Sequence, residues 1–123
     1  SIISNQNSIS VFSLELFTQH DRDGMILTDR INALNLRMRE SAPDYETGWH
    51  VAGDPTLIII QKGILRITLQ NGDSKNFSSG ESFIAKDFLP DHLEFDKDIH
   101  GHKAKVIGNQ TLKAIHVKLE ARV

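Results

Sequence analysis

The chain contains no cysteine among its 123 residues, which excludes disulfides and thiolate-bound metal sites. Histidine and carboxylate side chains are the strong metal ligands that remain, and six histidines are present. Proline is also scarce, with three residues, and no linker rich in Pro, Gly or Ser divides the chain. Together with the length, these absences favour one globular domain.

Long apolar runs and a strong charge of one sign are missing as well. No apolar stretch approaches the roughly 18 residues that a membrane span requires, and no basic-then-apolar segment typical of a signal peptide opens the sequence. The net charge is -2, and the lysines and arginines are scattered, which argues against a nucleic-acid partner. We therefore expect a cytoplasmic protein that contacts neither membrane nor nucleic acid.

The dominant pattern that is present is a strict alternation of apolar and polar residues. It is clearest over residues 34–39 and 115–119, and a period of two is typical of half-buried strands. Asn71-Gly72 separates two further strand-like segments, and this dipeptide favours a hairpin turn. The sequence predicts an all-β fold of two antiparallel sheets, either a sandwich or a small barrel.

Residues 1–10 are expected to form a loose N-terminal arm, and residues 11–123 the single domain. If the apolar residues of each alternating segment face one core, the buried positions include Leu36, Met38, Ile58, Ile60, Leu65, Ile67, Phe83, Ile115 and Val117.

Two segments resemble the motifs of a known family. They are QKGILRITLQNGDSKNFSSGESFIA, residues 61–85, and HGHKAKVIGN, residues 100–109. Together they resemble a cupin, in which Gly63 would follow the apolar strand of the first motif and Gly80-Glu81 would open the second. The resemblance covers about residues 44–119 and implies a jelly-roll β-barrel.

The same resemblance bears on metal binding. A cupin metal site uses two histidines one residue apart, a glutamate, and a third histidine from the second motif. His50 and His102 stand at two of these four positions, whereas Ala52 and Leu57 stand at the other two. Two imidazoles alone rarely hold a divalent ion tightly, so the metal-ligand motif is degenerate.

A substitute ligand is present in the sequence. His100 and His102 alternate as residues on one face of a strand do, about 7 Å apart at their Cα atoms. His50, His100 and His102 are therefore a candidate site for Fe, Mn, Ni or Zn. The competing interpretation is a ligand pocket without metal, lined by Trp49, His50 and His102.

Two functions follow from these interpretations, a purely structural dimer module is a third possibility, and the sequence does not decide whether the protein is an enzyme. One is a small cupin that binds a small organic molecule in its barrel with weak or no metal dependence. The alternative is a metal-dependent oxygenase, isomerase or lyase that acts on a small polar metabolite. Residues 87–98, an acidic insertion, are either a solvated loop or a cover for the pocket. Because the alternating segments supply more apolar surface than one small barrel hides, we expect a homodimer.

Overall fold

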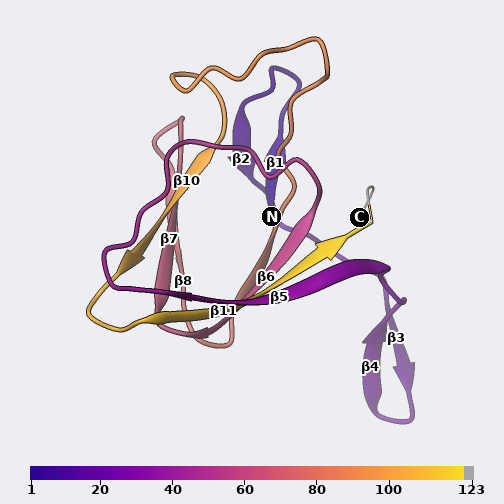
Figure 1. The fold of residues 1–123 in the computed structure, drawn as a ribbon. Coiled ribbons are helices and arrows are strands. Elements are labelled where there is room, and N and C mark those ends of the chain that lie inside the picture. The colour runs from indigo at the N-terminus through magenta and orange to yellow at the C-terminus, as the bar shows by residue number, and fades with distance from the viewer. Residues whose placement is uncertain (121–123) are drawn as a thin grey trace.

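The computed structural model describes residues 1–120, and this part of the chain contains strands and no helix (Figure 1). It therefore contains no helix that would cross a membrane. The strands are β1 (Ile2–Ser4), β2 (Ser10–Phe12), β3 (Gln19–Arg22), β4 (Met25–Thr28), β5 (Ala33–Ser41), β6 (Thr56–Lys62), β7 (Ile64–Leu69), β8 (Ser74–Phe77), β9 (Ser82–Ala85), β10 (His102–Ile107) and β11 (Leu112–Leu119).

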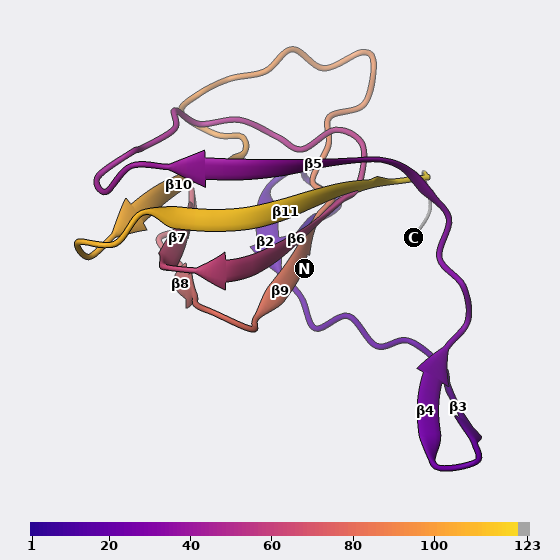
Figure 2. The same ribbon diagram turned by 60° about the horizontal axis from the view of Figure 1, so that its bottom comes forward.

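Two sheets enclose the core of the molecule. The larger sheet has the strand order β2-β1-β9-β6-β11-β5, and the smaller has the order β10-β7-β8. All of their pairings are antiparallel except the short contact between β1 and β9. Strands β3 and β4 form a separate hairpin that projects from the barrel (Figure 2). The predicted all-β jelly-roll architecture is confirmed.

The core lies between the two sheets. It is built by the inward-facing residues, which alternate with outward-facing ones along each strand. Five of the predicted core positions are buried, namely Ile58, Ile60, Leu65, Ile67 and Phe83. The predicted hairpin is also present: Gly72 adopts a positive φ of 94° between β7 and β8, a conformation that glycine tolerates at little cost.

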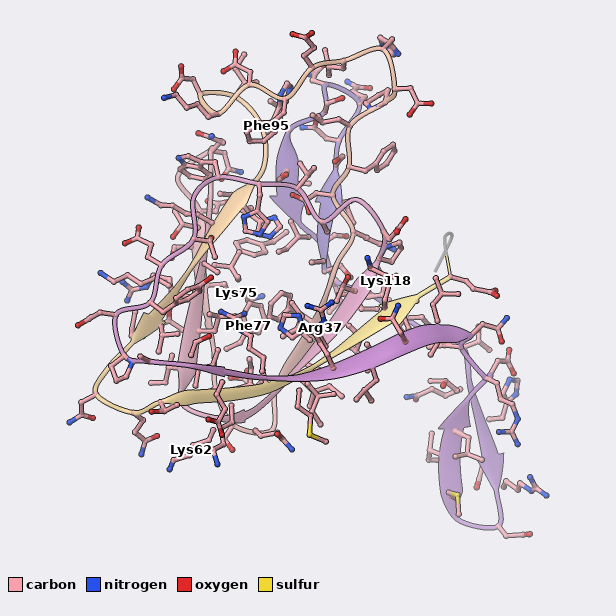
Figure 3. All side chains as sticks on the ribbon, viewed as in Figure 1. Arg37, Lys62, Lys75, Phe77, Phe95 and Lys118 are labelled. Atoms are coloured by element: carbon pink, nitrogen blue, oxygen red, sulfur yellow. The ribbon has the colours of Figure 1, made fainter. Side chains whose placement is uncertain are left out.

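The orientation predicted for β5 and for the second half of β11 is wrong. Leu36 and Met38 are 58% and 78% exposed, and Ile115 and Val117, their direct cross-strand neighbours, are only half-buried. The alternation of β5 does separate two faces, but the polar face is the one that lines the barrel. Figure 3 shows Arg37 of that face pointing between the sheets, whereas Lys62 points away from them.

The first residues of the chain are not a loose arm. Ile2 is fully buried, and β1 pairs with β2 and, through Ile2, with Ala85 of β9. Residues 1–10 thus supply an edge of the larger sheet. The expected domain limit at residue 123 lies outside the described residues.

Candidate functional site

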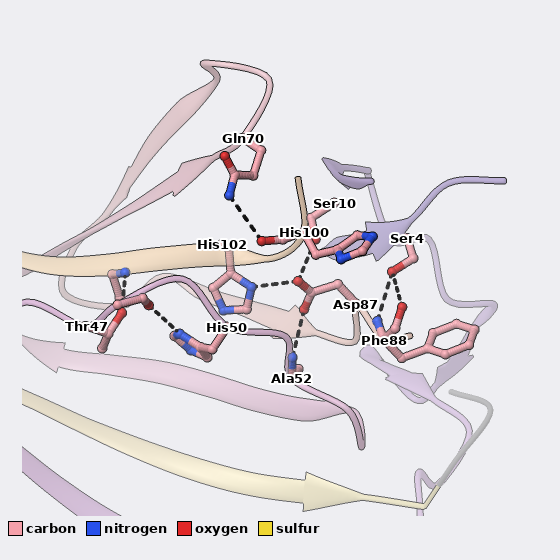
Figure 4. A network of polar contacts seen from close by, with 12 residues as sticks. Ser4, Ser10, Thr47, His50, Ala52, Gln70, Asp87, Phe88, His100 and His102 are labelled. Atoms are coloured by element: carbon pink, nitrogen blue, oxygen red, sulfur yellow. Dashed lines mark hydrogen bonds and ion pairs between the residues drawn. The ribbon is translucent and has the colours of Figure 1, made fainter. Parts of the chain in front are cut away.

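His50 and His102 lie side by side at one end of the barrel (Figure 4). Their backbones form an isolated antiparallel bridge, in which each N–H donates to the other carbonyl at 2.9 and 2.8 Å. Their ring centroids are 4.5 Å apart, with 56° between the ring planes. The two histidines carried over by the family resemblance are therefore brought together.

Gly101 explains how the two backbones approach so closely. Its φ is +89°, and a Cβ at this position would lie 2.5 Å from the carbonyl oxygen of His50 and 2.8 Å from its carbonyl carbon. Real Cβ atoms do not approach backbone atoms to such distances. A glycine is therefore required both for the backbone conformation and for the space beside His50.

Asp87 holds the His102 ring from the other side. This carboxylate is fully buried and accepts hydrogen bonds from His102 Nδ1 at 2.8 Å, Ser10 Oγ at 2.7 Å and the Ala52 backbone N–H at 3.1 Å. Its own carbonyl accepts a bond from the Gly53 N–H at 3.0 Å. Asp87 thereby joins three segments that are distant in the sequence.

The electrostatics of Asp87 favour its ionised form. Burial by itself would raise the pKa of this carboxyl. The effect of burial is outweighed by the hydrogen bond and charge of His102 and by the hydrogen bonds from Ser10 and Ala52, so the pKa lies below its ordinary value. An ionised carboxylate only accepts hydrogen bonds. His102 therefore carries a proton on Nδ1, which fixes its tautomer when the ring is neutral.

The ring of His50 is also held by a hydrogen bond at Nδ1. Its Nδ1 lies 2.9 Å from the carbonyl oxygen of Gly48, which can only accept, so Nδ1 carries the proton. Within residues 1–120, the Nε2 atoms of His50 and His102 have no hydrogen-bond partner. Each neutral ring thus offers a lone pair at Nε2, and each protonated ring offers a donor there.

His100 does not join this pair. The positive φ of Gly101 interrupts the extended backbone, so the alternation that would place His100 and His102 on one face does not apply. His100 is buried, and its Nδ1 accepts a hydrogen bond from the Asp96 N–H at 3.0 Å. It orders the loop of residues 87–98 and points away from His50 (Figure 4).

Trp49 also lies outside the histidine pair. It is half-buried and occupies a bend immediately before the bridge between His50 and His102. The Nζ atom of Lys103, on the opposite face of β10 from His102, lies 5.0 Å from the centre of the Trp49 ring. The structure therefore gives Trp49 a cation–π contact on the outer surface.

A cavity of about 460 Å³ lies along the edge strand β5. It is lined by residues of the inward parity, Arg37, Arg39 and His116, together with Met38, Glu40, Tyr45 and Thr47. His116 pairs directly with Arg37 across the two strands. Burial, followed by the charges of Arg39 and Arg37, lowers the pKa of His116. The inner wall of the barrel is thus cationic where the sequence predicted an apolar one.

Comparison with protein-family models and with curated proteins gave no match. Solved structures do match. A cupin domain from Bordetella pertussis superposes with a TM-score of 0.51 at 15% identity, covering 76% of this chain and 99% of that one. This protein has the cupin fold.

Two further cupin-like structures support the assignment. A protein with a cupin-2 domain from Shewanella frigidimarina gives a TM-score of 0.50 at 16% identity, covering 74% of this chain and 78% of its own. The polyketide cyclase RemF from Streptomyces resistomycificus gives 0.52 at 16% identity, covering 77% of this chain and 65% of the cyclase. At such identities the likeness extends to the fold alone.

The side chains of this cupin barrel do not fit a closed metal centre. Among the described residues, no group of three histidine or carboxylate side chains converges on a point where an ion would be held. The pair of His50 and His102 supplies two nitrogen donors, and structural or catalytic ions usually require three or four protein ligands.

The sequence interpretation missed two sets of residues at this site. Asp87 was assigned to the acidic insertion, although Phe83, Ala85 and Asp87 share the inward parity of β9. The expected burial of Leu36 and Met38 places Arg37 and Arg39 on the solvated side of β5, whereas both line the cavity. The parity of His116 with Leu112 and Ala114 was the signal that this side faces the barrel.

Proposed function

We propose that this cupin binds a small organic molecule in its barrel, with a polar group of that molecule at the Nε2 atoms of His50 and His102. The observation that supports the proposal is the way the two rings are held. Both Nδ1 atoms are engaged by the protein, and both Nε2 atoms are left without a partner within residues 1–120.

The Asp87–His102 pair is difficult to explain by stability alone. Both side chains are almost completely buried, with 0% and 6% exposure, and replacing a buried ion pair with apolar residues is often neutral or stabilising. Groups held in this way are common at functional sites. With Nδ1 bonded to Asp87, His102 can donate or accept a proton at Nε2 toward a bound molecule.

The same hydrogen bonds favour one second candidate, the metal-dependent enzyme. Histidines that ligate a metal through Nε2 commonly donate Nδ1–H to a carboxylate or a carbonyl, as His102 and His50 do here. This candidate requires ligands beyond the two imidazoles. Elemental analysis of the protein purified without a chelating tag distinguishes the candidates, because only the second predicts a stoichiometric divalent ion.

The binding proposal is tested by His50→Ala, with His92→Ala as the matched control. His50 is exposed and not part of the buried core, so its truncation leaves the Asp87–His102 bond in place. His92 lies in the exposed loop of residues 87–98. Calorimetric titration with a panel of small polar metabolites should show binding to the wild type and to His92→Ala, and at least about tenfold weaker binding to His50→Ala. Equal affinities in both variants would refute the proposal.

The cytoplasmic setting expected from the sequence is part of the same proposal.

A further inference from the structure

Two guanidinium groups stand on the inner wall of the barrel. Arg37 and Arg39 are two residues apart on β5, so their side chains share one face of the strand, and both line the cavity. Arg39 is half-buried, with its Nε donating to Ser41 Oγ at 2.8 Å and its Cζ 5.4 Å from the centre of the Tyr45 ring. These contacts hold the Arg39 head group at the cavity.

Neither guanidinium is neutralised by the described part of the protein. Within residues 1–120, no carboxylate lies within ion-pair distance of Arg37 or Arg39. Glu40, the carboxylate that also lines the cavity, lies 3.5 Å from Lys113 instead. Two positive charges next to each other therefore face the cavity without a counter-ion from these residues.

A third polar side chain, that of His116, lines the same cavity. The Nε2 atom of His116 is buried and lacks a hydrogen-bond partner in the described chain. Buried polar atoms are normally paired, and an exception calls for an explanation such as a missing ligand. His116 pairs directly with Arg37 across β11 and β5 and lines the same cavity, so this atom lies next to the guanidinium groups.

We propose that the molecule bound in the barrel is a small organic carboxylate, and that Arg37 and Arg39 bind its carboxylate group with His116 beside them. This inference rests on the proposed function and names the chemical class of its ligand. A guanidinium presents its N–H donors in a planar fork that matches the two oxygens of a carboxylate. A cavity of about 460 Å³ is within the range of sites for small molecules.

The experiment compares carboxylates with their neutral amides. The protein is titrated with acetate, succinate and benzoate, and then with acetamide, succinamide and benzamide. The arginine Nε and histidine ring signals are followed by NMR. At least one carboxylate should shift the signals of His116, Arg37 and Arg39 in a saturable manner, and its amide should bind at least about tenfold more weakly.

Arg37→Gln provides the matched variant. Arg37 is exposed and makes no side-chain hydrogen bond to the described residues, so its replacement should not disturb folding. Arg39→Gln would also remove the contacts to Ser41 and Tyr45. Arg66→Gln, on the outer face of β7, is the control. The dissociation constant of the carboxylate should rise about tenfold or more in Arg37→Gln and stay unchanged in Arg66→Gln.

Several results would overturn the inference. These are equal binding of a carboxylate and its amide, equal affinities of Arg37→Gln and Arg66→Gln, or inorganic phosphate binding more tightly than every carboxylate tested. If neutral compounds shift His50 and His102 while Arg37→Gln has no effect, the inference fails and the proposed function stands. If no compound shifts any barrel histidine, both fail.

Discussion

Asp87 is the residue through which the candidate site is tied to the rest of the molecule. Its carboxylate accepts bonds from Ser10 near the N-terminus, from Ala52 before β6 and from His102 at the start of β10. The ionised carboxylate accepts all three bonds at once, and a proton on one of its oxygens would disturb the bonds to that oxygen, so the charge of Asp87 contributes to stability.

Asp87→Asn should change how stability depends on pH. The pKa of Asp87 is lowered in the folded protein, so its contribution is fully present above the pKa of the unfolded chain, near pH 4. It is lost as the pH falls through the lower folded value. Urea unfolding from pH 7 to pH 3 should show this acid loss in the wild type, and a smaller loss in Asp87→Asn.

At pH 7 the same variant should be less stable by about 1–3 kcal/mol, because its amide cannot replace the charge-assisted bonds. Asp91→Asn, an exposed carboxylate of the same loop, is the control and should keep the wild-type profile. Parallel acid profiles for Asp87→Asn and the wild type would contradict the role given to this carboxylate.

Gly101 offers a second test at single-residue scale. Gly101→Ala combines a positive φ with a Cβ placed 2.5 Å from a backbone oxygen, whereas Gly80→Ala has a similar φ of +87° and no atom within 4 Å. The backbone conformation alone costs about 1–2 kcal/mol for alanine. Urea unfolding should therefore give a loss of that size for Gly80→Ala and a clearly larger loss for Gly101→Ala. Equal losses would show that the close approach to His50 is unimportant.

At the scale of elements, β5 shows what an alternating sequence does and does not determine. A period of two separates the faces of a strand, but it does not say which face is inside. The expectation that apolar residues face inward failed here because β5 is the edge strand of the larger sheet and its polar face lines an open cavity. The apolar side chains of β5 are consequently left on the outer surface.

We propose that a second copy of the chain covers this outer surface, as expected from the composition of β5. Leu34, Leu36 and Met38 are 57%, 58% and 78% exposed, which is an unusual row for a monomer. The projecting β3–β4 hairpin also exposes Met25 and Ile26, at 59% and 58%, and a two-stranded hairpin alone is marginally stable. An apolar partner surface would bury both sets of side chains and so stabilise β5 and the hairpin.

Leu36→Glu should disrupt this homodimer by placing a charge in the interface. Leu16→Glu, at a position 84% exposed and outside the strands, is the control. Sedimentation at micromolar concentration should give a dimer for the wild type and the control, and a monomer for Leu36→Glu. A wild type that sediments only as a monomer would count against the interface.

At the scale of the whole molecule, the sequence predicted the architecture better than the site. Alternation and the Asn71-Gly72 turn were enough for the two-sheet barrel, because burial of one face and turn geometry are local properties. His50 and His102 were found through the spacing of the cupin motifs. Asp87, by contrast, was indistinguishable from its acidic neighbours before the topology brought Ser10 and His102 to it.

The cupin barrel also explains why His100 was misplaced. The prediction assumed an unbroken strand from residue 100 to 102, whereas Gly101 has a positive φ and β10 begins at His102. This single left-handed residue turns the ring of His100, the expected third metal ligand, toward the backbone N–H of Asp96. The turn at Gly101 depends on the close approach of the His50 backbone, a contact between distant segments that the local sequence does not predict.

Binding of a small molecule at His50 and His102 is tested most directly by an imidazole ¹H–¹⁵N spectrum of the protein, recorded with a chelator present during titration with small polar metabolites. At least one compound should shift the ring signals of His50 and His102 in a saturable manner and leave those of the exposed His92 unchanged. Ring signals of His50 and His102 that shift only after a divalent ion is added would show that the pair binds metal and not the small molecule itself.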